Sequence, residues 1–305
     1  MANELLAPKE NTLTLMRERR CAVMVTYYPD SEVKRRIWNC LPQIDQLIVV
    51  DNTPEADAEL LEIAYNKPQI HIVSNRSNLG IAEALNQGVR LASGWGYKWV
   101  LILDQDSEIV EGLLDSLLAV ARSGLSNIGV IGANYRDIRS GRSLASNGEE
   151  GEYEERPTVI TSGSLINIAL FNEAGGFRAD YFIDQVDHEY CLRIRRLGAK
   201  VLLSKQIYME HCVGEAGGIR VPILGVLPEH SALRRYYMAR NSIVTIKEYF
   251  SHEIGWSLRR AVRLVGGFFL VAIFDKSRRY KTQAFLQGVW DGIHGKMGRR
   301  EWPFH

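Results

Sequence analysis

The sequence contains neither a long hydrophobic run nor a leader-like start. Within its 305 residues, no apolar stretch approaches the ~18 residues that a membrane-spanning helix needs. Residues 1–20 include no apolar core segment, so we expect no secretory signal peptide. Internal repeats and low-complexity linkers are also missing. The composition, with 46% hydrophobic and 24% charged residues, instead indicates a soluble protein with a sizeable core.

Cysteine is scarce, and its spacing is irregular. The four cysteines are Cys21, Cys40, Cys191 and Cys212, and no two of them form a CxxC pair. Each lies in an apolar or helical pattern. We therefore expect buried, reduced thiols of a cytosolic protein rather than a disulfide framework or a zinc site.

Two common nucleotide-binding motifs are missing as well. No GxGxxG follows the first apolar run, which argues against a dinucleotide-dependent dehydrogenase. No GxxxxGK[ST] occurs anywhere, which argues against a phosphate-loop NTPase.

The net charge of +1 hides a basic C-terminal segment. Residues 256–300 hold ten Lys and Arg against Asp275 and Asp291, which indicates an anionic partner, either nucleic acid or membrane lipid. Only apolar residues and glycine occur in 264–274, with basic residues on both sides. As a helix this stretch reaches about 16 Å, so we expect it either to lie in a membrane interface or to be buried in the enzyme or a dimer. Its apolar centre argues against nucleic acid.

Short apolar runs alternate with helical patterns along the first half of the chain. The runs predict strands at residues 21–29, 46–53, 70–75, 98–107 and 128–135. The spacing of apolar residues predicts helices at 30–41, 78–92, 109–123 and 186–198, with Ser31 as the cap of the first. This alternation predicts an α/β protein, a three-layer sandwich around a mainly parallel sheet.

Polar residues follow each early strand. They are Thr26 and Tyr27, Asp51 and Asn52, Asn75 and Arg76, and Asp104 and Asp106. In open α/β sheets, ligands bind outside the carboxyl ends of the strands, so we expect these side chains to share one edge.

The stretch "VLILDQDS" at residues 100–107 places two carboxylates at a strand end. Asp104 and Asp106 would repel each other, and a divalent cation would remove that cost. Mg²⁺ and Mn²⁺ favour carboxylate oxygens, often together with substrate phosphates. The alternative is that Asp104 caps the next helix and Asp106 is solvated.

With Asp51, "SNLGIAEALNQGV" and "LILDQDS", the chain resembles glycosyltransferase family 2, which has the GT-A fold. Further along, "TSGSLINIALFNEAGGFRADYFIDQVDHEYCLRIRRLG" and "LRRYYMARN" resemble the bacterial rhamnosyltransferases of that family. The resemblance runs from about Cys21 to the C-terminus. The order of the segments is specific, although no single motif is.

The resemblance implies transfer of L-rhamnose from dTDP-L-rhamnose, with inversion and a divalent cation (Mg²⁺ or Mn²⁺), to a hydroxyl of a glycolipid, lipopolysaccharide or lipid-linked glycan. A UDP-hexose or another nucleotide-sugar donor is the close alternative. A nucleotidyltransferase also uses paired carboxylates, but it usually has a basic, glycine-rich loop near the first strand. "TYYPDSEV" is not such a loop.

The resemblance also implies roles for individual residues. Asp187 would be the catalytic base, although the residues alone leave Asp184 and Glu189 as other candidates and an N-cap role for Asp187 open. Asp51 would bind the nucleobase, and Asp104, Asp106 and His211 would bind the metal. The expected donor-binding residues are Thr26, Tyr27, Asp51, Asn52, Arg76, Asn78, Gly80, Asn86, Asp104, Gln105, Arg235, Tyr236 and Arg240. The expected acceptor-side residues are Gly163, Ser164, Asp184 and Glu189.

These expectations divide the chain into three parts. They are an N-terminal extension (1–20), a GT-A catalytic domain (21–250) and a helical, basic C-terminal region (251–305). The expected partners are a nucleotide-sugar, a glycolipid or glycan acceptor and an anionic membrane surface, but no nucleic acid. We expect a cytoplasmic protein, peripheral at the inner face of the cytoplasmic membrane. Whether copies of the chain associate stays open.

Overall fold

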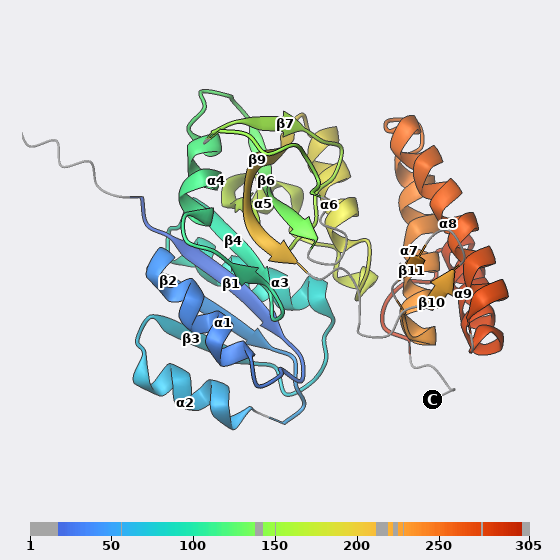
Figure 1. Ribbon diagram of the computed structural model, residues 1–305, viewed down its shortest axis with the longest axis horizontal. Helices are drawn as coiled ribbons and strands as arrows, with labels where there is room; N and C mark the ends of the chain where they lie inside the picture. The colour runs from blue at the N-terminus through green and yellow to red at the C-terminus, as the bar shows by residue number, and fades with distance from the viewer. Residues whose placement is uncertain are drawn as a thin grey trace, which may run out of the picture.

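A nine-stranded mixed sheet lies at the centre of the protein, with three long helices beside it (Figure 1). The strand order is β3-β2-β1-β4-β8-β6-β9-β5, and β7 pairs with β9. The structure is a computed structural model, and it describes residues 18–55, 57–137, 143–149, 151–211, 219–221, 225–227, 229–275 and 277–300.

The first four strands of the sheet are parallel, and all but β3 at the edge are almost wholly buried. They are β1 (Cys21–Thr26), β2 (Gln46–Asp51), β3 (Ile70–Ser74) and β4 (Trp99–Asp104). Thr26 pairs with Asp51 and Asp51 with Ser74, while Val25 pairs with Asp104. Because the strands are parallel and in this register, their polar carboxyl ends are level along one edge, as the sequence predicts.

The second half of the sheet is mixed. Its strands are β5 (Glu108–Ile109), β6 (Ile128–Asp137), β7 (Tyr153–Glu155), β8 (Ser164–Asn167) and β9 (Lys200–His211). Strand β8 is antiparallel to both β4 and β6, whereas β6 and β9 are parallel. The predicted α/β class is confirmed, and the antiparallel strands are added on one side of the parallel group.

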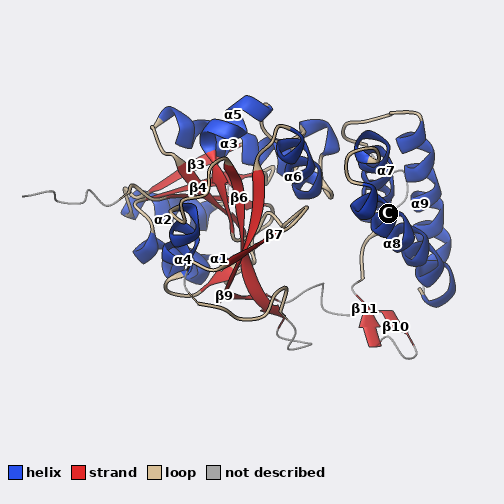
Figure 2. Ribbon diagram, turned by 90° about the horizontal axis from the view of Figure 1, so that it is seen from above, coloured by secondary structure: helices blue, strands red, loops and turns tan. Residues whose placement is uncertain are grey.

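Helices cover both faces of the sheet (Figure 2). One face carries α1 (Val33–Cys40), α2 (Ala58–Asn66) and α4 (Leu113–Ala121), and the other carries α3 (Ile81–Gly94), α5 (Ile168–Ala174) and α6 (Val186–Arg196). Two short 3-10 helices, η1 (Leu41–Gln43) and η2 (Ala179–Tyr181), complete this part. Along β1, Val23 and Val25 join one core while Ala22 and Met24 join the other, because successive strand side chains point to opposite faces.

Some local predictions require correction. Helix α1 begins at Val33 with Glu32 at its N-cap and no side-chain cap bond, so Ser31 is not the cap. Helix α2 was not predicted; the carboxylate of Asp57 caps it by accepting from Leu60 N at 3.0 Å.

The cysteines match the expected pattern where the structure describes them. Cys21, Cys40 and Cys191 are buried free thiols. Burial raises the pKa of each thiol to about 12, so these groups stay protonated and behave as small apolar side chains. Cys212 lies outside the described residues.

Helices α7 (Ala232–Tyr249), α8 (Ile254–Phe274) and α9 (Arg278–Ile293) form a layer at one side of the sheet domain (Figure 1). A short hairpin, β10 (Ile219–Val221) and β11 (Gly225–Leu227), lies near the layer. A Cβ at Gly288 would lie 2.3 Å from the Tyr236 carbonyl oxygen, and one at Gly292 would lie 2.7 Å from the Arg240 carbonyl oxygen. Glycine at these two positions therefore lets α9 lie against α7.

None of the helices in the described ranges has the length and apolarity to cross a bilayer. The predicted boundary between catalytic and C-terminal parts, at residues 250 and 251, falls between α7 and α8. That division stays a prediction. Helix α7 lies on the predicted catalytic side but packs along α9, so the two parts share a helical core.

Candidate active site

Asp51 ends β2 as a buried carboxylate with a fixed orientation. Its Oδ1 accepts from Thr26 Oγ1 at 2.9 Å, from Thr53 Oγ1 at 2.7 Å and from Thr53 N at 3.1 Å. Asp51 is 1% exposed. Three donors on one oxygen hold the carboxylate in a single rotamer at the level of the strand ends, which suits a group that recognises a ligand.

The loop between β3 and α3 is shaped by contacts among its own polar groups. Asn52 Nδ2 donates to the Gly80 carbonyl at 3.1 Å, and its Oδ1 accepts from Asn75. Gly80 N donates to Asn78 Oδ1 at 2.9 Å. Gly80 has a φ of +84°, and a Cβ there would lie 2.6 Å from the Phe182 carbonyl oxygen. In this loop, residues that were expected to bind the donor form hydrogen bonds with one another and so build the wall of the sheet edge.

Gln105 links the ends of β1 and β4. Its Oε1 accepts from Tyr27 N at 2.7 Å, and its carbonyl accepts from Arg36 Nη1 at 3.1 Å. The Tyr27 ring is 44% exposed beside this link. Arg76, an expected donor-binding residue, lies in the loop after β3 with a φ of +51°. Because its side chain is exposed, Tyr27 is available for stacking at the sheet edge.

Asp104 and Asp106 lie in a tight turn after β4. Ser107 N donates to the Asp104 carbonyl at 3.0 Å, and Asp104 N donates to Ser107 Oγ at 3.0 Å. Helix α4 begins at Leu113 with Gly112 at its N-cap, so Asp104 does not cap it. Asp106 is exposed. Burial, and then the negative charges of Asp106 and Asp187, raise the Asp104 pKa to about 7.

The charges of Asp106 and Asp187 both act on Asp104, so these three carboxylates lie near one another. Asp104 and Asp106 come from the sheet edge, whereas Asp187 comes from the first turn of α6. The positive charge of Arg234 acts in the opposite direction and lowers the Asp104 pKa. The sequence predicted both groups of carboxylates, and the structure brings them together.

Asp187 follows a turn with unusual backbone geometry. Phe182, Asp184 and Gln185 have φ values of 65°, 64° and 64°, in the left-handed region that non-glycine residues rarely adopt. Gln185 occupies the N-cap of α6 and Asp187 lies inside the first turn, so the N-cap alternative for Asp187 is wrong. Asp187 Oδ1 accepts from His188 N at 2.8 Å.

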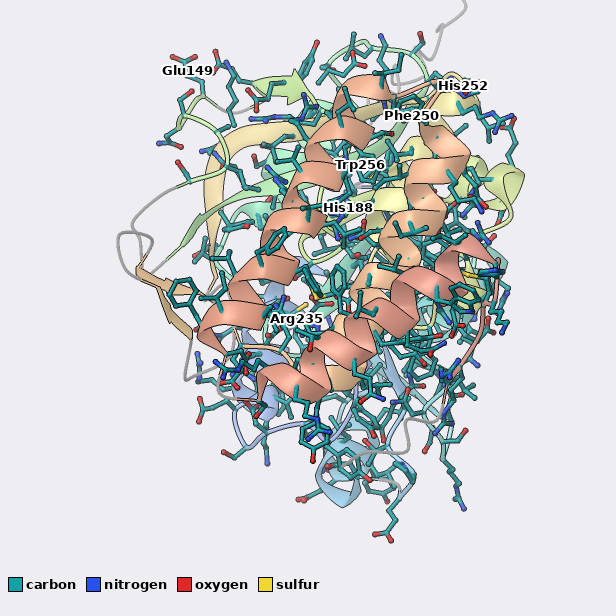
Figure 3. All side chains as sticks on the ribbon, turned by 90° about the vertical axis from the view of Figure 1, so that its right-hand side faces the viewer. Glu149, His188, Arg235, Phe250, His252 and Trp256 are labelled. Carbon is teal, nitrogen blue, oxygen red and sulfur yellow. The ribbon has the colours of Figure 1, made fainter. Side chains whose placement is uncertain are left out.

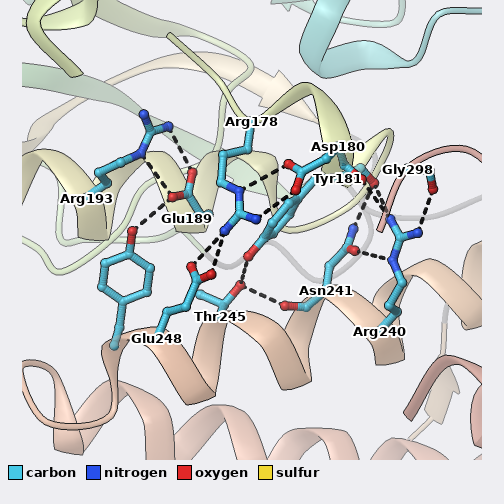
Figure 4. Close-up of polar contacts among 11 residues, drawn as sticks. Arg178, Asp180, Tyr181, Glu189, Arg193, Arg240, Asn241, Thr245, Glu248 and Gly298 are labelled. Carbon is cyan, nitrogen blue, oxygen red and sulfur yellow. Dashed lines mark hydrogen bonds and ion pairs between the residues drawn. The ribbon is translucent and has the colours of Figure 1, made fainter. Parts of the chain in front are cut away.

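Helix α7 holds this turn in place. Asn241 Nδ2 lies 3.0, 2.8 and 2.9 Å from the carbonyl oxygens of Tyr181, Ile183 and Asp184. Arg240 is fully buried, and its Nη2 donates to the Asp180 and Tyr181 carbonyls at 3.1 Å (Figure 4). Residues of α7 therefore fix the backbone that carries Asp184 and Asp187.

Asp184 is half-buried, and its negative charge is only partly compensated. Its Oδ1 accepts from Arg234 Nε at 3.4 Å, and its Oδ2 has no hydrogen-bond partner among the described residues. Burial raises the Asp184 pKa, and Arg234 opposes the shift. The next residue of α7 is Arg235; its Nε has no hydrogen-bond partner in the described part of the chain, and burial lowers its pKa. These orphaned atoms are available to a ligand.

Several other residues that were predicted to contact a ligand have side chains that bond to protein groups in this structure. Their contact with a ligand stays a prediction. Tyr236 donates its hydroxyl to Asp291 Oδ2 at 2.8 Å. Asn86 pairs with the Phe177 backbone through both amide atoms, at 2.7 and 2.8 Å. Glu189 is 1% exposed and pairs with Arg193 at 3.0 Å (Figure 4). We leave these residues, and the enclosed Arg240, out of the site.

The predicted acceptor-side residues at the start of β8 are also buried. Ser164 Oγ donates to the Ile160 carbonyl at 2.5 Å. Gly163 N donates to the Ile102 carbonyl at 2.8 Å and joins the strand to β4. These contacts place the start of β8 beneath the site, and direct contact with an acceptor stays a prediction.

The residues present fit a divalent cation that is shared with a ligand rather than enclosed by protein. Among the described side chains, no cluster of three or more His, Cys, Asp or Glu could hold a metal ion. The Asp104–Asp106 pair, with its mutual repulsion, is the donor set that Mg²⁺ uses together with substrate phosphates. The side chain of His211 lies outside the described residues. The residue before His211 is Glu210, which pairs in the sheet with Glu108. Glu108 is two residues after Asp106.

A cavity of about 580 Å³ opens next to Asp187 on the side of α8. Its polar and aromatic walls include Arg156, His188, Trp256, Arg259, Arg260 and Arg263, and we call it the arginine cavity. The rings of His188 and Trp256 lie 5.8 Å apart, and Figure 3 shows them next to each other, seen through the helical layer. The sequence showed the basic residues of α8 but not that some of them line a cavity.

A family model described as glycosyl transferase family 2 matches residues 21–179. The chain is also similar to dTDP-rhamnosyl transferase RfbF of Shigella flexneri. The two are 27% identical over 293 residues, which cover 91% of this chain and 96% of the relative.

Solved structures with a similar fold include S. aureus TarS 1–349 in complex with UDP-GlcNAc. It is 13% identical with a TM-score of 0.54, and the match covers 91% of this chain and 92% of that one. GalNAc-T7 with UDP, GalNAc and Mn²⁺ is 11% identical with a TM-score of 0.56, over 91% and 57% of the two chains. The match spans only 44% of the longer TarS chain. These likenesses support the GT-A type fold.

Proposed function

The chain belongs to glycosyl transferase family 2, and on that premise we propose that it is a metal-dependent, inverting rhamnosyltransferase. It would move L-rhamnose from dTDP-L-rhamnose to a hydroxyl of a glycolipid, lipopolysaccharide or lipid-linked glycan. The choice of donor is supported by the similarity to a dTDP-rhamnosyl transferase along 96% of that relative. Family membership leaves no reason to keep the nucleotidyltransferase alternative.

The observation that carries the proposal is that Asp187, in the first turn of α6, lies near enough to the end of β4 for its charge to act on Asp104, beside Asp106. Inverting transfer needs a base on the acceptor side of the sugar and charge stabilisation at the leaving diphosphate. In the proposed reaction, the acceptor hydroxyl gives its proton to the Asp187 carboxylate as its oxygen bonds to the anomeric carbon. The bond from that carbon to the diphosphate oxygen breaks, and dTDP leaves with the electron pair.

The donor side would use groups of the sheet edge. Asp104 and Asp106 would hold the divalent cation, which when bound neutralises charge on the diphosphate as a Lewis acid. Asp51, fixed by its three hydrogen bonds, would accept from the nucleobase. The GalNAc-T7 structure was solved with UDP and Mn²⁺ together, which supports a cation in this fold.

Helix α8 supports a membrane-bound acceptor. Six apolar side chains, spaced three or four residues apart, are between 52% and 72% exposed: Ile254, Leu258, Val262, Val265, Phe269 and Ile273. We call this the α8 stripe. Arg278 and Arg279 lie just beyond it, at the start of α9, and are exposed. An exposed apolar stripe beside basic residues supports peripheral binding to anionic lipid, and the location that we propose is the inner face of the cytoplasmic membrane.

A UDP-hexose donor is the second candidate. It is favoured by the TarS 1–349 structure, which has a similar fold and was solved in complex with UDP-GlcNAc. The Asp104–Asp106 pair would serve in the same way, because it would act at the diphosphate of the donor rather than at its sugar.

A donor screen tests the proposal. The purified chain is incubated with dTDP-L-rhamnose, UDP-GlcNAc or UDP-glucose, with Mg²⁺, with Mn²⁺ or after chelation, and nucleotide release is measured. We expect release from dTDP-L-rhamnose only with metal. Faster release from a UDP-sugar would support the second candidate, and no release from any donor would contradict both.

A further inference from the structure

The arginine cavity lies on the acceptor side of the candidate base. His188, which follows Asp187, forms part of its wall together with Trp256 of α8. Asp187 itself lines a smaller neighbouring hollow that shares Val159 and Ile160 with the cavity. The cavity and the candidate base are therefore neighbours along this wall. The volume, about 580 Å³, is in the range of small-molecule sites.

The positive charge in this cavity is only partly balanced by the protein. Arg259, Arg260 and Arg263 come from one face of α8, and Arg156 comes from the loop opposite. Arg156 pairs with Glu154. Arg260 donates to Ser242 Oγ at 2.8 and 3.0 Å, and the charges of Asp187 and Asp184 oppose the lowering of its pKa by burial.

Arg259 and Arg263 differ from the other two arginines. Within the described part of the chain, no carboxylate lies within 4.0 Å of either guanidinium, and neither makes a side-chain hydrogen bond. They are four residues apart, so they lie on one side of the helix and repel each other. Burial lowers the His188 pKa; the negative charge of Asp187 opposes this shift, and the positive charges of Arg260 and Arg263 add to it. An anion that enters the cavity would relieve this repulsion.

The shape and chemistry of the walls narrow the choice of anion. The guanidinium group presents a planar set of donors that matches phosphate oxygens, and several arginines can bind a diphosphate together. Trp256 offers an apolar ring against which a sugar face or a lipid chain can lie. The α8 stripe lies on the outer side of the same helix, away from the cavity.

We propose that the arginine cavity is an anion subsite that binds a phosphate or diphosphate group of the acceptor. The acceptor would then be a phosphorylated glycan whose reactive hydroxyl reaches Asp187 while its phosphate contacts Arg259 and Arg263. This inference rests on the proposed function in one respect, namely that Asp187 marks the acceptor side. The phosphate comes either from a lipid-linked diphosphate or from a sugar phosphate.

The test measures binding to the full chain saturated with dTDP and Mg²⁺, so that the donor site is filled. The probes are farnesyl diphosphate and glucose 1-phosphate, with farnesol as the uncharged comparison. The variants are Arg259→Gln and Arg263→Gln. Arg196→Gln is the matched control, since Arg196 is an exposed arginine at the far end of α6. Calorimetry gives the Kd of each probe and, separately, of dTDP.

We expect each cavity variant to weaken binding of the preferred phosphate probe about tenfold or more, because a hydrogen bond to a charged group is lost. The control variant, dTDP affinity and farnesol should change little. Tighter binding of farnesyl diphosphate points to a lipid-linked source, and tighter binding of glucose 1-phosphate points to a sugar phosphate. If dTDP still binds, then equal phosphate Kd values in all variants, or no phosphate binding at all, would overturn the inference. Failure of the wild-type chain to bind dTDP would instead count against the proposed donor.

Discussion

Two groups of carboxylates meet in the candidate site, and different parts of the chain hold them in place. Asp51 and Asp104 end parallel strands, and their contacts come from neighbouring strand ends and turns such as Thr26 and Ser107. Asp184 and Asp187 lie in or just after a turn with three left-handed residues, and that turn is fixed by α7, whose Asn241 is more than fifty residues further along the chain.

This difference separates donor binding from acceptor activation. Asp51 and the Asp104–Asp106 pair are held by the strand ends, the turns that follow them and Arg36 of α1, without a hydrogen bond from the described residues of the helical layer. The candidate base also depends on the helical layer, because the backbone before α6 is costly to form and persists only where its surroundings hold it. Changes at the edge should therefore affect every step, whereas changes in α7 should affect turnover more than donor affinity.

The largest effect is expected at the sheet edge. We predict that Asp106→Ala abolishes measurable transfer and donor hydrolysis, and that Asp104→Asn is severely impaired. Loss of the cation removes several kcal/mol of charge stabilisation, roughly a factor of 10⁴ in rate. Glu62→Ala, at an exposed glutamate of α2, is the control. Chelation should have the same effect as Asp106→Ala, and full activity after exhaustive chelation would contradict the metal role.

The second prediction separates the two groups of carboxylates. Asp187→Asn should lower turnover by ~10²–10⁴-fold, because a positioned base contributes about that much. The Kd of dTDP-L-rhamnose, measured by calorimetry, should stay nearly unchanged. If donor affinity collapsed while turnover at saturation remained high, Asp187 would be a binding residue and the contrast between the two groups would lose its basis.

The third prediction tests the role of α7. Asn241→Ala removes the amide that lies within 3.0 Å of three carbonyl oxygens before α6. We expect a loss of about 1–3 kcal/mol in the free energy of unfolding, since buried carbonyls lose their partner. Turnover should fall by roughly tenfold at a temperature where the variant is fully folded, because the base loses its position.

Turnover and donor affinity, measured together, separate a positioning role for Asn241 from a purely structural one. In Asn241→Ala the Kd of dTDP-L-rhamnose should match that of the wild type, and Gln283→Ala, at an exposed position of α9, should leave both quantities unchanged. A lower melting temperature with full turnover below it would show that Asn241 stabilises the fold without positioning the base.

The sequence predicted the sheet edge because the relevant pattern is local. A buried apolar run followed by a carboxylate, as at Asp51 and Asp104, shows where a strand ends, and parallel pairing then brings such ends together. It could not predict that Asn241 holds the turn before α6, because that contact joins distant segments and leaves no periodic pattern.

The same limit explains the residues of α7 and α8. Tyr236 and Arg240 are four residues apart and share one face of α7, but spacing in the sequence does not say what covers that face. The pair Gly288 and Gly292, four residues apart on α9, was the available signal, since both face α7 closely. The basic residues of α8 suggested a membrane, and only the packing of α8 shows that Arg263 also lines a cavity.

The smallest expected effect concerns the α8 stripe. We predict that the wild-type chain sediments with anionic vesicles at low salt, binds neutral vesicles less, and is released as salt rises. Basic residues near an anionic surface contribute about 1 kcal/mol each, and this attraction is screened by salt, whereas burial of the stripe is not. Val265→Glu with Phe269→Glu places charge in the stripe at two side chains that are 56% and 55% exposed. Vesicle binding should fall several-fold, while nucleotide release from a soluble donor stays unchanged.

Leu61→Glu with Tyr65→Glu is the matched control, because these α2 side chains are also four residues apart and exposed. It should bind vesicles like the wild type, since α2 lies on the sheet domain and not in the helical layer.

Sedimentation equilibrium tests the other role that an exposed apolar stripe can have, which is contact between two copies of the chain. If the wild-type chain is a dimer that the α8 variant converts to monomer, and vesicle binding is the same in both, then the stripe is an interface between copies. The acceptor must in that case reach the arginine cavity without help from the membrane surface.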